Sequence, residues 1–145
     1  MGVIDRILVS LTKISPRFFI RWVSNRYIAG TTTKDALETI RKMEIKGCCS
    51  TVDVLGEEIS HIGDIKKFSN VYETIIEAIS SEGLDANISI KPTAFGLLVN
   101  RDSAYSNIES ITRKAQKLDS FVRLDMEDSR VTQETIDVML AMHSK

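Results

Sequence analysis

The sequence predicts an α/β protein, and more specifically part of a (βα)8 TIM barrel with about three strand–helix units that follow N-terminal helices. Short runs of β-branched and small apolar residues alternate with longer segments whose apolar residues recur at helical spacing. This alternation favours βαβ units and a parallel sheet. The ends of the predicted strands are 38 and 34 residues apart, close to the roughly 31 residues that one unit of a barrel takes.

The segment 1–30 is expected to form a basic, aromatic helical segment of its own. It contains five basic residues and one acidic residue, and Ser15-Pro16 is typical of a helix start. The predicted helix ends at Gly30 and carries aromatic residues at Phe18, Phe19, Trp22 and Tyr27. Such a helix can lie on an anionic membrane surface. Most amphipathic helices pack against a core instead, and we favour that interpretation.

From residue 31 onward, helices and strands are predicted to alternate. The predicted elements are a helix from Thr33 to Gly47, a strand 48–55, a helix 65–83, a strand 86–91, a helix 108–118, a strand 121–125 and a helix from Thr132. Thr33 and Thr132 are expected to cap their helices, and glycine to end the first two helices. Cys48 and Cys49 are expected to begin a buried strand as small apolar residues.

Composition argues against several classes of protein. A chain of 145 residues suggests one domain, and a net charge of -1 argues against a nucleic-acid binder. No run approaches the roughly 20 apolar residues that span a bilayer. The two cysteines are adjacent and form no disulfide framework, which favours a reduced, cytoplasmic protein. His61 and His143 have no partner at metal-ligand spacing, so no metal site is expected.

Each predicted strand ends in an ionisable residue: Asp53, Lys91 and Asp125. In a barrel the C-terminal ends of the strands lie on one face, where catalytic groups stand. Two carboxylates and one ammonium that meet there can bind a zwitterion or shift each other's pKa. A structural network of ion pairs is the alternative. Because three consecutive strand ends carry such residues, we favour the functional interpretation.

Three segments around these residues resemble the proline dehydrogenase (proline oxidase) family, namely Val52–Glu57, Ser89–Leu97 and Val122–Ser129. They match the family in order, separation and predicted strand context. The resemblance extends from about Tyr27 to Lys145 and corresponds to the N-terminal half of the monofunctional bacterial type. It therefore identifies 31–145 as the N-terminal part of a proline dehydrogenase-like barrel.

The resemblance implies an oxidoreductase of proline catabolism, which uses FAD to oxidise L-proline to Δ1-pyrroline-5-carboxylate and passes electrons to a quinone of the electron-transport chain. It implies that Lys91 binds the substrate carboxylate and takes part in catalysis. Asp125 matches the catalytic aspartate at the flavin, and Met126 follows it where its backbone would meet the FAD. Asp53 matches a carboxylate that lines the proline pocket, and Glu57 supports the same wall.

Three strand–helix units cannot close a barrel of eight, so we expect the 145 residues to be an incomplete portion that is inactive alone. The C-terminal half would then follow on the same polypeptide, or the chain would associate with itself or a partner. Two alternatives to proline oxidation remain open. One is a Schiff-base lyase or aldolase-type barrel with Lys91 as nucleophile, and the other is a non-catalytic half-barrel. We expect a cytoplasmic protein, and peripheral contact with the inner face of the cytoplasmic membrane is the alternative to packing of the segment 1–30 on a core.

Overall fold

The computed structural model describes residues 16, 27–55, 62–127 and 129–144. The chain forms two units, residues 1–36 and 37–145. Most of the predicted helix within 1–30 lies outside the described residues, as do Glu57 and His61. The described residues therefore belong mainly to the second unit, together with residues 16 and 27–36 of the first.

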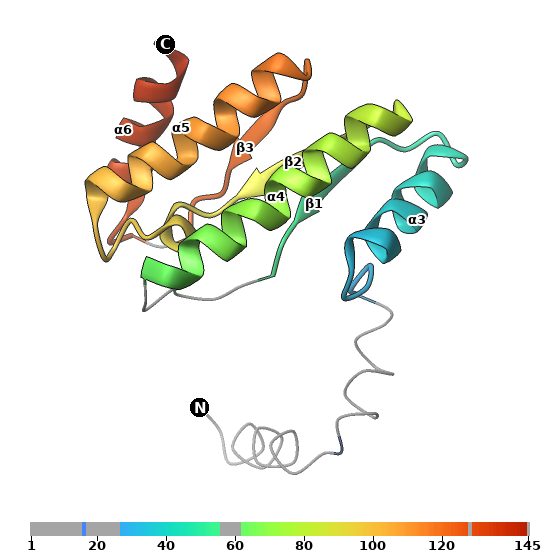
Figure 1. The fold of residues 1–145 in the computed structure, drawn as a ribbon, viewed down its shortest axis with the longest axis horizontal. Coiled ribbons are helices and arrows are strands. Elements are labelled where there is room, and N and C mark those ends of the chain that lie inside the picture. The colour runs from blue at the N-terminus through green and yellow to red at the C-terminus, as the bar shows by residue number, and fades with distance from the viewer. Residues whose placement is uncertain (1–15, 17–26, 56–61, 128, 145) are drawn as a thin grey trace. The chain divides into compact units, whose positions relative to one another are not determined.

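Helices and strands alternate along the described residues (Figure 1). In order they are α3 (Thr33–Glu44), β1 (Ser50–Asp53), α4 (Ile62–Glu82), β2 (Ala86–Ile90), the 3-10 helix η1 (Pro92–Phe95), α5 (Arg101–Lys117), β3 (Val122–Leu124) and α6 (Thr132–His143). The strands form one sheet in the order β1-β2-β3, and both pairs are parallel. The helix between consecutive strands is the crossover that parallel pairing requires. The predicted α/β class is confirmed.

The sheet has one apolar and one polar face, because side chains alternate along each strand. On β2, Ile88 and Ile90 are fully buried and belong to the core beneath α4 and α5, which lie side by side across this face (Figure 1). Asn87 and Ser89, which alternate with these two isoleucines along β2, bond to polar groups on or directly after the neighbouring strands. The Thr51 hydroxyl donates to Asn87 Oδ1 at 3.0 Å, and Ser89 donates to the carboxylate that follows β3. The polar face therefore holds a network of hydrogen bonds.

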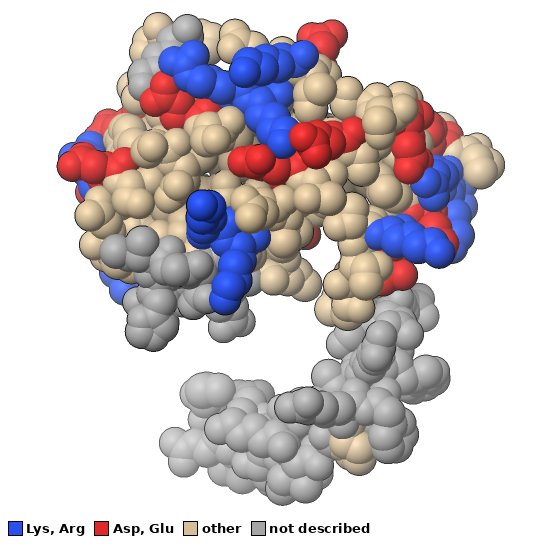
Figure 2. Space-filling model, in the orientation of Figure 1, with Lys and Arg blue, Asp and Glu red and all other residues tan. Residues whose placement is uncertain are grey.

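Helices α4 and α5 cover the sheet because each has an apolar stripe at helical spacing. The buried residues of the two stripes are Ile65, Tyr72, Ile75, Ile76, Ile79, Ala104, Ile108, Ile111 and Ala115. At their surface, Lys114 Nζ pairs with Glu77 at 2.7 Å and Glu73 at 3.0 Å. The hydrogen bond with Glu77 raises the pKa of Lys114, and the bond with Glu73 adds to this effect. Acidic and basic side chains are interspersed on the face shown in Figure 2.

The expectation that Cys48 and Cys49 begin a buried strand is wrong, because both are exposed and β1 begins at Ser50. The reason is the way α3 ends. Gly47 has a φ of 76°, and the Cys48 N–H donates to the carbonyl of Met43 at 3.0 Å. This is the hydrogen bond of a Schellman motif. The first cysteine therefore completes the end of the helix.

Two predicted helix caps are also displaced. The N-terminal cap of α3 is Thr32 and not Thr33, because Thr32 Oγ1 accepts from Asp35 N at 3.2 Å while Asp35 Oδ2 accepts from Thr32 N at 3.1 Å. This reciprocal pair is a capping box. Thr132 is the first residue of α6, after the cap position at Val131. Helix α5 begins earlier than its apolar pattern predicted because its first turn is polar.

Removing the side-chain cap of α5 is expected to destabilise the fold. Asn100 accepts a hydrogen bond from Ser103 N at 2.9 Å, and Asn100→Ala is expected to lower the free energy of unfolding by about 1 kcal/mol. Urea unfolding of the chain measures the change. Ser106→Ala, at an exposed site inside the same helix, is the control and should be near neutral. Equal stability of the two variants would contradict the assigned cap.

Candidate active site

The three ionisable strand-end residues meet at one edge of the sheet. Asp53 ends β1, while Lys91 and Asp125 directly follow β2 and β3. Lys91 Nζ contacts Asp53 Oδ2 and lies 3.8 Å from Asp125 Oδ2. The side chains of Lys91, Asp53 and Asp125 are 24%, 29% and 45% exposed, so a small molecule in solvent can reach them. We call these three residues the Lys91 cluster.

Each carboxylate of the Lys91 cluster also contacts a hydroxyl group. Tyr72 lies 3.2 Å from Asp53 Oδ1, and Ser89 Oγ donates to Asp125 Oδ1 at 2.5 Å. In both aspartates, the second oxygen is the one that faces Lys91. The hydroxyls therefore limit the rotation of the two carboxylates around the ammonium.

Tyr72 reaches this edge from α4, although its ring belongs to the core. The side chain is fully buried, and its ring centroid lies 5.5 Å from that of Phe68 and 5.7 Å from that of Phe95. Its hydroxyl lies 2.9 Å from the carbonyl oxygen of Ser89 and accepts from the N–H of Val54 at 3.2 Å. Tyr72 therefore joins the end of β1 to β2.

The environment of Tyr72 predicts a loss of stability in alkali. Burial is the main cause that raises the pKa of Tyr72 above its ordinary value of 10.0, and the charge of Asp53 acts in the same direction. The contribution of this raised pKa to the free energy of unfolding is therefore fully present below about pH 10. It is lost as the pH rises further, because Tyr72 ionises at a lower pH in the unfolded chain than in the folded one. The stability difference between wild type and Tyr72→Phe should shrink by up to about 1.4 kcal/mol per pH unit. A difference in urea unfolding that stays constant through alkaline pH would contradict this assignment.

The loops after β2 and β3 are also joined beside the Lys91 cluster. The Thr93 hydroxyl of η1 donates to the carboxylate of Glu127. Met126, between Asp125 and Glu127, is 54% exposed. Its side chain is therefore available to a ligand, while the predicted role of its backbone stays a prediction.

Sequence reasoning missed the two hydroxyl partners for different reasons. Ser89 could have been found, because it stands two residues before Lys91 and so shares its face of the strand. Tyr72 could not, because helical spacing places it in the core but does not show how far its hydroxyl reaches. The predicted roles of Asp53, Lys91 and Asp125 stay predictions, although the structure brings the three side chains together.

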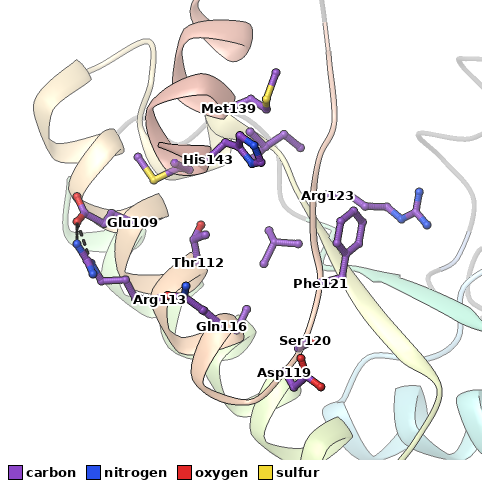
Figure 3. A pocket seen from close by; sticks show the side chains of 14 residues that line it. Glu109, Thr112, Arg113, Gln116, Asp119, Ser120, Phe121, Arg123, Met139 and His143 are labelled. Atoms are coloured by element: carbon purple, nitrogen blue, oxygen red, sulfur yellow. Dashed lines mark hydrogen bonds and ion pairs between the residues drawn. The ribbon is translucent and has the colours of Figure 1, made fainter. Parts of the chain in front are cut away.

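A cavity in the described part of the chain lies away from the Lys91 cluster. A groove of about 660 Å³ runs between α5, β3 and α6, and none of the Lys91 cluster lines it. Figure 3 shows Glu109 and Arg113 of α5 on one side, Met139 and His143 of α6 on another, and Phe121 beside β3. The candidate active site therefore rests on the chemistry of its side chains and not on the size of a cavity.

Two features are absent from the residues that the structure describes. None of the helices there combines the length and apolar character needed to cross a membrane. In the same part of the chain, no group of three or more His, Cys, Asp or Glu side chains is arranged to hold a metal ion.

Comparison with known proteins relates most of the chain to one family. Residues 36–145 match the profile of the family described as proline dehydrogenase. The chain is 29% identical over 129 residues to proline dehydrogenase 1 of Bacillus subtilis subsp. natto, which covers 89% of this chain and 43% of the relative. It is 27% identical over 118 residues to proline dehydrogenase of Deinococcus radiodurans, with coverage of 79% and 38%. The chain thus spans less than half the length of these curated relatives.

A solved structure shares the fold. The crystal structure of proline utilization A (PutA) from Bdellovibrio bacteriovorus inactivated by N-propargylglycine aligns with a TM-score of 0.73 and 20% sequence identity. The alignment covers 81% of this chain and 15% of that protein. At this identity the likeness shows the fold alone.

Proposed function

Because this chain belongs to the proline dehydrogenase family, we propose that it forms part of an enzyme that oxidises L-proline to Δ1-pyrroline-5-carboxylate with FAD. The observation that carries the proposal is the Lys91 ammonium between the carboxylates of Asp53 and Asp125. This arrangement stands at the carboxyl edge of a parallel sheet, where barrel enzymes place their active sites.

The charges of the Lys91 cluster are complementary to a zwitterion. A lysine ammonium has three donors, and in this structure two carboxylates are within reach of them. The third donor can bind the carboxylate of proline, while Asp53 or Asp125 accepts from the protonated ring nitrogen. The cluster would thereby bind both the carboxylate and the ring nitrogen of proline and so orient its ring.

Residues after β3 fit the edge of a flavin. Asp125 is nearly half exposed, and Met126 beside it exposes an apolar, polarizable side chain of the kind that packs against aromatic rings. These two residues would hold the ring system of FAD against the substrate. When bound, FAD supplies the acceptor for the two electrons removed from proline. The chain's own residues would bind and orient the substrate.

Completion of the active site by further strands is part of the proposal. Among the described residues, β1 and β3 each pair with β2 alone. The groove beside β3 is lined by the partly exposed side chains of Phe121 and Met139 (Figure 3). Additional barrel strands, from the same polypeptide or a partner, would cover this surface and supply the other residues around the flavin.

We also propose a quinone as electron acceptor and a cytoplasmic location, with contact at the inner face of the cytoplasmic membrane as the alternative to packing of the segment 1–30 on a core. The support for membrane contact is the excess of basic residues in 1–30. Binding to vesicles that contain anionic lipid tests this part. Reversal of charge at Arg17 and Arg21 should weaken that binding, and equal binding would contradict the membrane contact.

The lyase alternative is less well supported. It needs a neutral Lys91 amine that is free to attack a carbonyl. In the structure the same amine contacts one carboxylate and lies near a second. Because the Lys91 amine lies between the carboxylates of Asp53 and Asp125, the arrangement favours binding of a zwitterion over nucleophilic attack.

The test is a visible spectrum of the chain after mixing with FAD and removal of unbound flavin. The measurement is repeated with the C-terminal part of a curated relative added, and L-proline is then supplied without oxygen. We expect bound flavin that bleaches with proline only in the presence of the second polypeptide. Bleaching by the chain alone would contradict incompleteness, and no bleaching in either mixture would contradict proline oxidation. D-proline is the matched control substrate.

A further inference from the structure

Tyr72 contacts three polar groups through one hydroxyl. The group lies 2.9 Å from Ser89 O and 3.2 Å from Asp53 Oδ1, and it accepts from Val54 N at 3.2 Å. A phenol has one proton to donate, so the carbonyl and the carboxylate share it. The carbonyl is nearer, but the charged carboxylate is the stronger acceptor. The hydroxyl of Tyr72 is therefore a fixed point against which Asp53 can be oriented.

The two oxygens of Asp53 have different partners. Oδ1 faces the Tyr72 hydroxyl and Oδ2 contacts Lys91 Nζ. A carboxylate held at one oxygen cannot turn freely about its terminal bond, so its other oxygen keeps its direction toward the ammonium. The aromatic packing of Tyr72 against Phe68 and Phe95 in turn fixes the ring that carries the hydroxyl.

We propose that Tyr72 is a positioning residue of the active site, which holds Asp53 so that the carboxylate fixes the Lys91 ammonium in the direction of the substrate carboxylate. The role toward substrate rests on the proposed function. The arrangement of Tyr72, Asp53 and Lys91 can be tested without flavin or proline. Tyr72→Phe is the informative change, because it removes the hydroxyl and leaves the ring.

The first experiment measures the rate at which an amine-reactive reagent labels Lys91 in the folded chain, residue by residue. Lys114 is the internal reference, because it also lies between two carboxylates and its partner Glu73 follows Tyr72 in α4. In Tyr72→Phe, labelling of Lys91 relative to Lys114 should rise about fivefold, the factor that corresponds to loss of one ordinary hydrogen bond. The matched control Tyr105→Phe removes a hydroxyl that pairs with Arg101 on α5, and should leave the ratio unchanged.

A double variant distinguishes the positioning of Asp53 by Tyr72 from a general loss of rigidity in the fold. Asp53→Asn should raise the labelling of Lys91 by itself, and adding Tyr72→Phe should then bring no further rise, because Tyr72 acts through Asp53. An unchanged ratio in folded Tyr72→Phe would overturn the proposal. So would an equal rise in both lysines, or independent effects of Tyr72→Phe and Asp53→Asn.

A second measurement uses the unaltered chain and remains decisive if Tyr72→Phe does not fold. The Tyr72 hydroxyl proton should be visible by NMR, because burial slows its exchange with water. Scalar coupling from this proton to the carboxyl carbon of Asp53 is expected, whereas coupling to the Ser89 carbonyl carbon alone would overturn the proposal. Neither measurement involves flavin, so failure of the proposed function and failure of the Tyr72 role are distinguishable.

Discussion

Replacing Lys91 by methionine is expected to lower kcat/KM for proline by about 30- to 100-fold in the flavin-containing enzyme, mainly through a higher KM. The reason is loss of the cation that binds the substrate carboxylate, together with repulsion from the two aspartates left behind. Truncation of one partner in a largely desolvated charge pair costs about 2 to 3 kcal/mol, and Lys91 is 24% exposed. Steady-state kinetics with proline as the varied substrate measures the change.

The chain contains a closely matched control for this variant. Lys114 also lies between two carboxylates and its side chain is 25% exposed, but it is on the outer surface of α4 and α5. Lys114→Met should lower the free energy of unfolding about as much as Lys91→Met does. It should leave kcat and KM for proline unchanged. Similar kinetic losses in both variants, or normal kinetics in Lys91→Met, would remove Lys91 from the substrate site.

Phe95→Ala is expected to have the largest effect on stability, a loss of about 3 to 5 kcal/mol in the free energy of unfolding. Phe95 is fully buried, with its ring centroid 6.1 Å from that of Phe68 and 5.7 Å from that of Tyr72. Its removal leaves a cavity beneath the residue that contacts Asp53, so the Lys91 cluster should loosen as well. Urea unfolding of the chain measures the stability directly.

Phe121→Ala provides the comparison for Phe95→Ala. Phe121 is 60% exposed, and its ring lies under the guanidinium of Arg123 at 5.5 Å. Loss of an exposed aromatic side chain with one such cation–π contact should cost less than about 1 kcal/mol. If the two alanine variants lose equal stability, the packing of Phe95 in the core does not account for the stability of the fold.

The order of strands and helices was predictable because short runs of β-branched and small apolar residues alternate with longer segments whose apolar residues recur at helical spacing. The meeting of Asp53, Lys91 and Asp125 followed from one further rule, that parallel strands end at the same edge of a sheet. Neither prediction requires knowledge of how the helices and strands pack against one another. Both can therefore be made from the sequence.

Features that depend on how elements join or dock were not predictable in the same way. Burial of Cys48 was expected from its small apolar character, but its N–H is used at the end of α3. The contact between Tyr72 and Asp53 depends on the position of α4 along the sheet. The spacing of apolar residues within α4 does not determine that position. The cap at Thr32 could have been found, because Asp35 stands at the position that a capping box requires.

The parallel order β1-β2-β3 also has a consequence for the kinetics of folding. Each strand pair closes a loop that contains a whole helix, so chain entropy is lost before the strands gain any contact. Helices α4 and α5 form from local contacts and are expected to appear first. The arrangement of Lys91 between Asp53 and Asp125 needs the ends of all three strands and is therefore expected among the last events of refolding. Full protection of the Lys91 amine thus marks the moment at which all three strands have paired.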